Sequence, residues 1–533
     1  MKFLLLSNVN MQPLARLLKP WDVSCGAYNS ILSELSTRDS SASAPSTTHV
    51  LCLFDTDAML GDALYGGGAP VQCEAFLAAL DGFTLRHPDK VVITSTFCTG
   101  SNRWLGFADI THAASLKTLE SGLNARLASI ARSRPNLLVL DMELLFRRHG
   151  EEALVSNAFW YAARTRYTEQ MFNLLAETVR RGMKAYTQQH RKVLVLDLDN
   201  TLWGGIVGEV GPHGIALSEE GGGRCYRDFQ RCLKAVQRTG VLLAVCSKNN
   251  PADVDEVFAE NTMMLLRRED FAAIQVNWEP KPDNIAQIAK NLSLATDSFV
   301  YIDDNAAERE AVSRFLPDIA VPSFPARIEN LPSWFMRDVV PVYFAKYTIT
   351  EEDSRKTEQY RANEARHKLV NGFDLDSYLA ELGIECSIHV DAPSRLVRAA
   401  QMTQKTNQFN LTSRRYDVTD LARFVESPEH AVLMLDYRDR FGEEGAVGLA
   451  IVDLAEGRID TLLTSCRVIG RKTERQLLDK VIELCTRRGH RRIVGEYVPT
   501  RKNDLAAGFY ESHGFTLSAE HPDGRRIYEK AIA

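Results

Sequence analysis

The chain has 533 residues, of which 25% are charged and 45% are apolar, and 63 Lys and Arg against 69 Asp and Glu give a formal net charge of −6. These values exclude a disordered or fibrous protein, and the mild negative balance gives no reason to expect nucleic-acid or membrane binding. Because one hydrophobic core rarely grows beyond about 250–300 residues, the length predicts several domains.

The ten cysteines are scattered along the chain, and none forms a Cys-x-x-Cys pair. A disulfide scaffold and a zinc site both need clustered cysteines, so we expect free thiols in a reducing compartment. The apolar run near the amino end, residues 3–6, is shorter than the core of a signal peptide. No run approaches the ~20 apolar residues that a membrane span needs. We therefore expect a cytoplasmic protein.

The first block alternates short apolar runs, each ending in a polar residue, with sequence of helical period. The runs lie at residues 2–6, 50–54, 91–95 and 136–141. This alternation is typical of parallel strands joined by crossover helices. It predicts an α/β domain over residues 1–185.

Two further blocks follow. The central block, residues 190–345, has strand-like runs at 193–196, 241–246 and 298–302, each followed at once by polar residues. Ligand sites of doubly wound sheets lie beyond the carboxyl ends of the strands, so we expect these polar residues to converge. A charged, helical connecting segment at 346–374 leads to an α+β domain at 375–533. Its predicted strands are 386–390, 431–435, 447–452 and 492–496.

The first central strand leads directly into a DxDxT motif made by Asp197, Asp199 and Thr201. Two carboxylates at this spacing can divide their roles, one as a nucleophile and the other as a proton donor and acceptor. Mg²⁺ prefers oxygen ligands and would screen the repulsion between the carboxylates and a phosphate. The alternative interpretation is a strand-to-turn transition in which the aspartates only cap backbone groups.

Three more segments favour the catalytic interpretation. Ser247 ends the second strand, Lys281 lies between two prolines before a predicted helix, and Asp303 and Asp304 end the last strand. This order of aspartate pair, hydroxyl, lysine and aspartate pair resembles the four-part signature of the haloacid dehalogenase (HAD) superfamily. The central block is therefore expected to hold a HAD-type parallel sheet.

The HAD resemblance implies a role for each motif residue. Asp197 would be the nucleophile, and Asp199 would protonate the leaving group and then activate water. The groups that would hold the phosphoryl oxygens are Thr201, Ser247 and Lys281.

The same resemblance implies Mg²⁺ as the cofactor. Its ligands would be Asp197, the main-chain carbonyl of Asp199, and the pair Asp303 and Asp304, of which Asp304 is favoured. Fewer than fifty residues separate the first two motifs, which leaves no room for a large cap domain.

One HAD branch is resembled more closely. Segments that resemble the FkbH-like proteins lie at residues 197–211, 244–250, 277–280, 303–308, 404–411, 465–470 and 509–515. Members of that family take a glyceryl unit from 1,3-bisphosphoglycerate and load it onto the phosphopantetheine thiol of an acyl carrier protein in polyketide pathways. The resemblance implies that substrate and that partner here.

A thioester product suggests a thiol intermediate, for which Cys246 is the candidate because it directly precedes Ser247. Lys248 and a helix start nearby would favour the thiolate. The alternative is that Cys246 is a small apolar strand residue pointing into the core. The sequence leaves both interpretations open.

The outer blocks also resemble known folds. Residues 375–533 look like a GNAT acyltransferase, with Arg467, Gly470 and Arg471 matching the start of the R-x-x-G-x-G/A loop that cradles a pyrophosphate. Lys472 departs from that pattern, since it stands where a second small residue belongs. Residues 1–185 resemble an SGNH hydrolase from Ser7 onward. The usual Gly-Asp-Ser is absent, which favours a docking or scaffold unit.

Three functions compete. The first is a Mg²⁺-dependent HAD enzyme that dephosphorylates 1,3-bisphosphoglycerate and loads the glyceryl unit onto a carrier protein. The second is a stand-alone phosphatase of a small metabolite. The third is an inactive carrier-protein binding module, and the complete set of motif residues argues against it.

Overall fold

The computed structural model describes residues 1–66, 69–101, 103–350, 353, 355–362, 382–440, 442–465, 468–469 and 471–532. The chain divides into two compact units, of which the first comprises Met1–Tyr186 with Val418–Asp420 and the second comprises Thr187–Asp417 with Leu421–Ala533. The central and C-terminal blocks thus share one unit. Much of the predicted connecting segment, residues 351–352, 354 and 363–374, lies outside the described residues.

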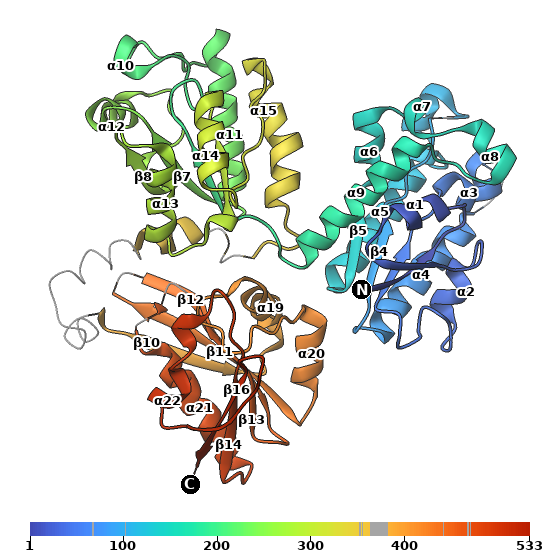
Figure 1. Ribbon diagram of the computed structural model, residues 1–533. Helices are drawn as coiled ribbons and strands as arrows, with labels where there is room; N and C mark the ends of the chain where they lie inside the picture. The colour runs from blue at the N-terminus through green and yellow to red at the C-terminus, as the bar shows by residue number, and fades with distance from the viewer. Residues whose placement is uncertain are drawn as a thin grey trace. The chain divides into compact units, whose positions relative to one another are not determined.

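The first unit is built on a fully parallel five-stranded sheet with strand order β2-β1-β3-β4-β5 (Figure 1). Its strands are β1 (Lys2–Leu6), β2 (Asp22–Cys25), β3 (His49–Cys52), β4 (Val91–Ser95) and β5 (Leu137–Leu140). Its helices are α1 (Gln12–Leu17), α2 (Ile31–Ser36), α3 (Thr56–Leu60), α4 (Val71–Arg86), α5 (Leu116–Ser133), α6 (Met142–His149), α7 (Glu151–Leu154), α8 (Asn157–Ala163) and α9 (Glu169–Tyr186). The domain is α/β, as predicted, and its SGNH-like character stays a prediction.

The central block forms a second parallel sheet of four strands, in the order β8-β7-β6-β9. The strands are β6 (Val193–Leu196), β7 (Leu242–Ser247), β8 (Phe271–Val276) and β9 (Phe299–Ile302). The helices are α10 (Val207–Val210), α11 (Arg224–Gln237), α12 (Pro251–Glu260), α13 (Lys281–Asn291), α14 (Ala306–Phe315) and α15 (Leu331–Trp334), followed by the π-helix η7 (Phe335–Phe344).

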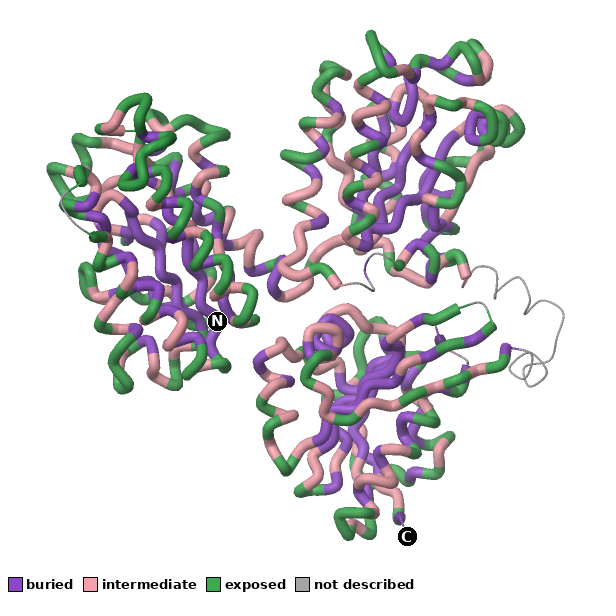
Figure 2. The backbone as a smooth tube through the Cα atoms, turned by 180° about the vertical axis from the view of Figure 1, so that it is seen from behind, coloured by how far each residue is buried: buried purple, intermediate pink, exposed green. Residues whose placement is uncertain are grey.

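Three strands of the central sheet, β6, β7 and β9, are buried at every residue, and Figure 2 shows the sheet mainly as buried backbone. Leu194 and Leu196 pack into one hydrophobic cluster, and Val193 and Val195 pack into another on the opposite face. A strand covered on both faces needs apolar residues at every position, which explains the continuous apolar run. Its polar residues therefore begin where the strand ends, at Asp197.

The segment between β6 and β7 is described throughout, and its helices are only α10, the 3-10 turn η3 (Gly221–Gly223) and α11. No large cap domain is inserted there. This agrees with the short spacing of the first two motifs.

The C-terminal block is an α+β structure on a seven-stranded sheet in the order β10-β11-β12-β13-β14-β16-β15. Neighbours are antiparallel except for β13 and β14, which are parallel. The strands are β10 (Glu385–Val390), β11 (His430–Asp439), β12 (Gly442–Asp453), β13 (Arg458–Thr464), β14 (Arg492–Tyr497), β15 (Thr516–Glu520) and β16 (Arg526–Ala531). The helices are α19 (Leu396–Lys405), α20 (Val418–Glu426), α21 (Thr473–Arg487) and α22 (Phe509–Ser512). Within the described part of the chain, no helix is long and apolar enough to cross a membrane.

Candidate active site

The four predicted motifs meet at the carboxyl edge of the central sheet. Asp197 follows β6, Ser247 is the last residue of β7, and Asp303 follows β9. The Asp197 amide donates to the Ile302 carbonyl at 3.0 Å, which fixes the ends of β6 and β9 side by side. Lys281 opens α13, whose backbone direction is set by the flanking Pro280 and Pro282.

Lys281 lies between two carboxylates. Its Nζ is 2.8 Å from Asp197 Oδ1 and 2.5 Å from Asp303 Oδ2, and all three side chains are buried. Asp303 is held further by the Tyr301 hydroxyl, which donates to Oδ2, and by the Asn305 amide, which donates to Oδ1 at 2.7 Å. Asp303 therefore anchors the lysine, and the lysine holds Asp197.

Burial and the neighbouring charges both shift the pKa values of Asp197 and Lys281. Burial raises the pKa of Asp197, Lys281 works against that rise, and Asp303 adds to it. Burial disfavours the charged form of Lys281, but the Asp197 and Asp303 carboxylates outweigh it and raise the pKa of Lys281. The lysine is thus a fixed cation. A second cation at this site would favour the ionised form of Asp197.

The Asp199 carboxylate is held by three donors. The Trp203 indole donates to Oδ1 at 2.8 Å, the Val207 amide donates to the same oxygen at 3.1 Å, and Asn249 Nδ2 donates to Oδ2 at 2.9 Å. Asn249 Nδ2 also donates to Ser247 Oγ at 3.1 Å. Asn249 is buried and joins the first two motifs.

Asn249 and Trp203 are site residues that the sequence did not single out. Both lie close in sequence to a motif, but nothing in the spacing shows that their side chains converge on Asp199. Only the fold, which places the ends of β6 and β7 side by side, brings them together.

Thr201 contributes a hydroxyl that is buried without a partner. Its side chain is 0% exposed, and within the described residues Oγ1 makes no hydrogen bond. A buried hydroxyl without a partner costs free energy, so such groups in native structures point to a ligand or a function. Its place in the turn that follows β6, four residues after Asp197, suits a group that binds a phosphoryl oxygen.

Three carboxylates could hold a cation here. Asp197, Asp303 and Asp304 each offer one oxygen, and these oxygens lie within 4.8 Å of one another. The Asp304 carboxylate is only partly buried, so it is accessible to a ligand. An all-oxygen set of this kind fits Mg²⁺. The Thr201 hydroxyl, which has no partner among the described residues, would suit a phosphoryl oxygen of a substrate bound with Mg²⁺.

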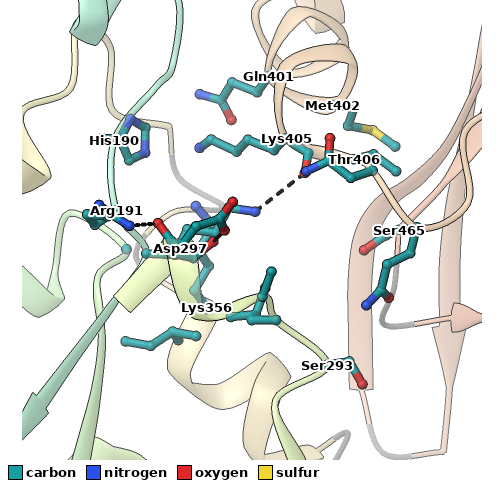
Figure 3. A pocket seen from close by; sticks show the side chains of 18 of the residues that line it. His190, Arg191, Ser293, Asp297, Lys356, Gln401, Met402, Lys405, Thr406 and Ser465 are labelled. Carbon is teal, nitrogen blue, oxygen red and sulfur yellow. Dashed lines mark hydrogen bonds between the residues drawn. The ribbon is translucent and has the colours of Figure 1, made fainter. Parts of the chain in front are cut away.

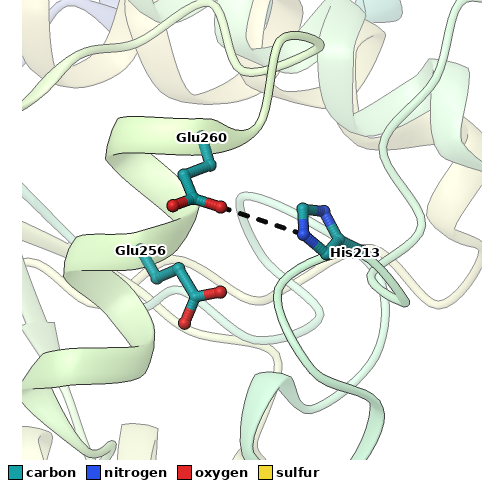
Figure 4. Close-up of side chains that lie close together, drawn as sticks. All are labelled: His213, Glu256 and Glu260. Carbon is teal, nitrogen blue, oxygen red and sulfur yellow. Dashed lines mark ion pairs between the residues drawn. The ribbon is translucent and has the colours of Figure 1, made fainter.

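Figure 4 shows a second group that could hold an ion, formed by His213, Glu256 and Glu260. All three are exposed, and His213 Nε2 lies 3.9 Å from a Glu260 oxygen. Exposed pairs of this kind contribute little and are common on protein surfaces. We assign this group no function.

The structure places Cys246 in the environment of the core interpretation, one of the two that the sequence leaves open. Its side chain is 0% exposed and belongs to the hydrophobic cluster on the Val195 face, and its Sγ lies 3.8 Å from the Lys281 carbonyl oxygen. Burial raises the pKa of this thiol to about 12. Lys248, expected to favour the thiolate, is paired instead with Glu308 at 2.7 Å. This is the environment of the core interpretation.

The predicted pyrophosphate loop of the C-terminal block is described only in part. Arg467 and Gly470 lie outside the described residues. Arg471 is buried, with its guanidinium 5.3 Å from the centre of the Tyr437 ring. Lys472 has a φ of +58°, in the left-handed region that favours glycine.

Comparison with known proteins gives the class of fold first. No protein-family model matches the chain, and no curated protein matches it. Among solved structures, it is similar to one that contains a phosphatase domain, with 24% identity and a TM-score of 0.58, over 63% of this chain and 92% of the other. That structure is the N-terminal part of BF1531 from Bacteroides fragilis, complexed with Mg. The shared region is longer than any one of the predicted blocks, so the common fold extends beyond the central sheet.

Two acetyltransferases match a smaller share. They are the ribosomal-protein-S18-alanine N-acetyltransferase of Escherichia coli, with 17% identity and a TM-score of 0.23, and a GNAT-family acetyltransferase of Streptococcus pneumoniae, with 17% identity and a TM-score of 0.21. Each match covers 28% of this chain, and they cover 95% and 100% of those chains. TM-scores this low assign no fold, so the GNAT-like character of residues 375–533 stays a prediction.

Proposed function

We propose that this chain is a Mg²⁺-dependent phosphatase in which Asp197 is the nucleophile. The observation that carries the proposal is the buried cluster in which Lys281 holds Asp197 at 2.8 Å, while Asp303 and Asp304 complete a set of oxygen ligands. Phosphoryl transfer depends mainly on positioning and charge neutralisation, and this cluster provides both. The similarity to a phosphatase domain solved with Mg supports a metal-dependent site.

In the proposed reaction, an Asp197 carboxylate oxygen attacks the phosphorus of a phosphate monoester. The new oxygen–phosphorus bond forms as the bond to the ester oxygen breaks, and Asp199 gives a proton to the departing oxygen. Asp199 then takes a proton from the water that hydrolyses the aspartyl-phosphate, which releases inorganic phosphate and restores Asp197.

The remaining groups bind and neutralise charge. Lys281 and the hydroxyls of Thr201 and Ser247 would bind the phosphoryl oxygens. Mg²⁺, which would be held by Asp197, Asp303, Asp304 and the main-chain carbonyl of Asp199, supplies a positive charge that favours transfer to a carboxylate.

A matched pair of variants tests the nucleophile. Phosphate release from p-nitrophenyl phosphate with Mg²⁺ is measured for the parent, for Asp197→Asn and for Asp283→Asn, a control that makes the same change at an exposed position of α13. We expect the rate of Asp197→Asn to fall by at least about 10³-fold, as expected for loss of a nucleophile. The control should keep the parent rate. An undiminished rate in Asp197→Asn refutes the assignment.

On the resemblance to FkbH-like proteins, we further propose 1,3-bisphosphoglycerate as the substrate and an acyl carrier protein as the acceptor. The carrier thiolate would attack the carbonyl carbon of the acyl phosphate, so that a carbon–sulfur bond forms and the carbon–oxygen bond to the phosphate breaks. The phosphate monoester of the same molecule would be hydrolysed at Asp197. Because Cys246 is buried in the core, we give it no part in carrying the glyceryl unit.

The intact mass of the carrier protein distinguishes glyceryl transfer from hydrolysis of phosphate alone. The carrier is incubated with this chain, Mg²⁺ and 1,3-bisphosphoglycerate. A mass gain that fits a glyceryl thioester supports transfer, whereas free phosphate with an unmodified carrier supports a stand-alone phosphatase. With Asp197→Asn, transfer predicts a carrier that keeps the monoester phosphate, as a phosphoglyceryl thioester.

A further inference from the structure

A separate cavity of about 240 Å³ lies at the opposite edge of the central sheet (Figure 3). His190, Arg191 and Lys192 line it just before β6, and Leu242 lines it at the start of β7. Asp197 lies at the other end of β6, which is four residues long, so about 13 Å of strand separates the cavity from the candidate active site. The cavity is therefore not an extension of that site.

The lining of this cavity is strongly cationic. Asp297 is the one carboxylate among the described residues that line it. The lysine and arginine residues of the lining are Arg191, Lys192, Lys356, Arg398, Lys405 and Lys502.

The carboxylates near the cavity are already paired. Asp297 lies 2.5 Å from Lys502 Nζ. Asp353, which is buried behind Lys356, pairs both with Lys356 and with Lys346, the latter at 3.1 Å. Among the residues that the structure describes, the lining of the cavity therefore carries an excess of positive charge.

Lys405 contributes to this excess of positive charge. Its Nζ has no hydrogen-bond or ion-pair partner among the described residues, and its carbonyl oxygen accepts from Lys192 Nζ at 3.4 Å. Burial and the nearby Lys356 and Lys346 lower the pKa of Lys405, and burial with Lys346 lowers the pKa of Lys356 to about 7. Cations this close together repel, and an anion between them would relieve the repulsion.

Two polar atoms at the cavity are also without partners. Within the described part of the chain, His190 Nδ1 and Gln401 Nε2 are buried and make no hydrogen bond, and the Gln401 side chain is 1% exposed. Figure 3 shows both side chains beside that of Lys405. A buried amide without a partner destabilises the fold, and an acceptor oxygen in the cavity would relieve that cost.

We propose that this cavity binds a small, multiply charged anion that carries a phosphate group, with Lys405 and Lys356 as its principal ligands. Lysine is a common ligand of phosphate, and the amide of Gln401 adds a directed donor. Leu242, Leu294 and Met402 give the same cavity an apolar wall, which suits an organic phosphate. The proposal does not depend on the phosphatase chemistry assigned to Asp197.

Calorimetry on the full chain tests the proposal. All variants carry Asp197→Asn and are kept in EDTA, so that turnover and metal-dependent binding are absent, and the probes are inorganic phosphate and 3-phosphoglycerate. We expect one binding site whose affinity falls at least about tenfold with Lys405→Met or Lys356→Met. It should be unchanged with Lys290→Met, at an exposed lysine of α13. Tighter binding of 3-phosphoglycerate than of phosphate identifies an organic phosphate as the ligand, and equal binding identifies phosphate itself.

Thermal unfolding gives an independent measurement with the opposite sign. Lys405→Met replaces a buried amine, packed near Lys356 and Lys346, with an apolar side chain, so the variant without ligand should have a higher Tm than its parent. The rise in Tm that the probes cause in the parent should be lost in the same variant. Equal affinity in Lys405→Met and Lys290→Met, or no binding of either probe at millimolar concentration, overturns the proposal.

Discussion

Asn249 links Asp199 to Ser247, and its substitution tests whether this link positions Asp199 for catalysis. Its amide nitrogen donates to Asp199 Oδ2 at 2.9 Å and to Ser247 Oγ at 3.1 Å, and its side chain is only 3% exposed. Asn249→Ala removes both hydrogen bonds and leaves Asp199 held by Trp203 and Val207 through the other oxygen alone. The carboxylate can then rotate away from the leaving group.

The size of the effect follows from the charge of the acceptor. A hydrogen bond to a charged group contributes about 1.5–3 kcal/mol, which corresponds to about 10- to 150-fold in rate if the position of Asp199 matters in the transition state. We expect kcat for phosphate release to fall within this range, and any change in KM reports the lost hydrogen bond to Ser247, which is proposed to bind a phosphoryl oxygen. Asn249→Asp should lose more, since it replaces the donor with a second carboxylate facing Asp199.

The neighbouring Asn250 provides the control. Its side chain accepts from the Ala252 amide and caps α12, and it is exposed. Asn250→Ala should cost about 1 kcal/mol of stability through the lost cap and leave kcat unchanged. If Asn249→Ala keeps the parent kcat, or if both variants lose kcat equally, Asn249 does not position Asp199.

Three further predictions concern single residues. Thr201→Val should keep or raise the Tm, because it removes a buried hydroxyl without a partner among the described residues. The same variant should lower kcat/KM for phosphate release about tenfold. A lower Tm with full activity would contradict both points. Asp304→Asn should raise the Mg²⁺ concentration for half-maximal activity about tenfold or more in a titration after EDTA treatment, and an unchanged value would remove Asp304 from the metal site. Burial raises the pKa of Asp55 from 3.8 to about 6. The first unit should therefore lose up to about 3 kcal/mol of stability as the pH rises from about 4 through 6. Thermal unfolding at a series of pH values should show this loss in the parent and not in Asp55→Asn.

The predictable part of the fold is the part buried on both faces. Strands β6, β7 and β9 fall at the predicted runs within a residue or two, because a strand covered on both faces is apolar throughout. The strands that the sequence did not predict are β2, β8, β13, β15 and β16. β2 and β15 are largely exposed, and charged side chains interrupt the apolar residues of β13 and β16, so none of these four shows a continuous apolar run. The apolar run of β8 is only four residues long, at 271–274. Pairing with a neighbour, which the sequence does not display, defines them as strands.

Some residues of the candidate site could be predicted from the sequence, and others could not. The carboxylates and Lys281 could be placed from the sequence because each directly follows a strand or opens a helix, and parallel strands bring those positions to one edge. The contacts of Asn249 could not, since they depend on the conformation of two loops. The cationic cavity was also beyond prediction, because Lys405 and His190 are 215 residues apart and meet only in the folded unit.

Cys246 and Ser247 are neighbours in sequence, but their positions on β7 give them different environments. Successive side chains of a strand point to opposite faces, so Cys246 shares the face of Ala244 and Leu242 and packs in the core, whereas Ser247 ends the strand beside Asn249. Ser247 can therefore face a phosphoryl group while the residue before it cannot. In the proposed glyceryl transfer, the attacking thiol is therefore that of the carrier and not Cys246. Cys246→Ala should then load the carrier at the parent rate, and loss of loading in a folded Cys246→Ala variant would return the thiol to the mechanism.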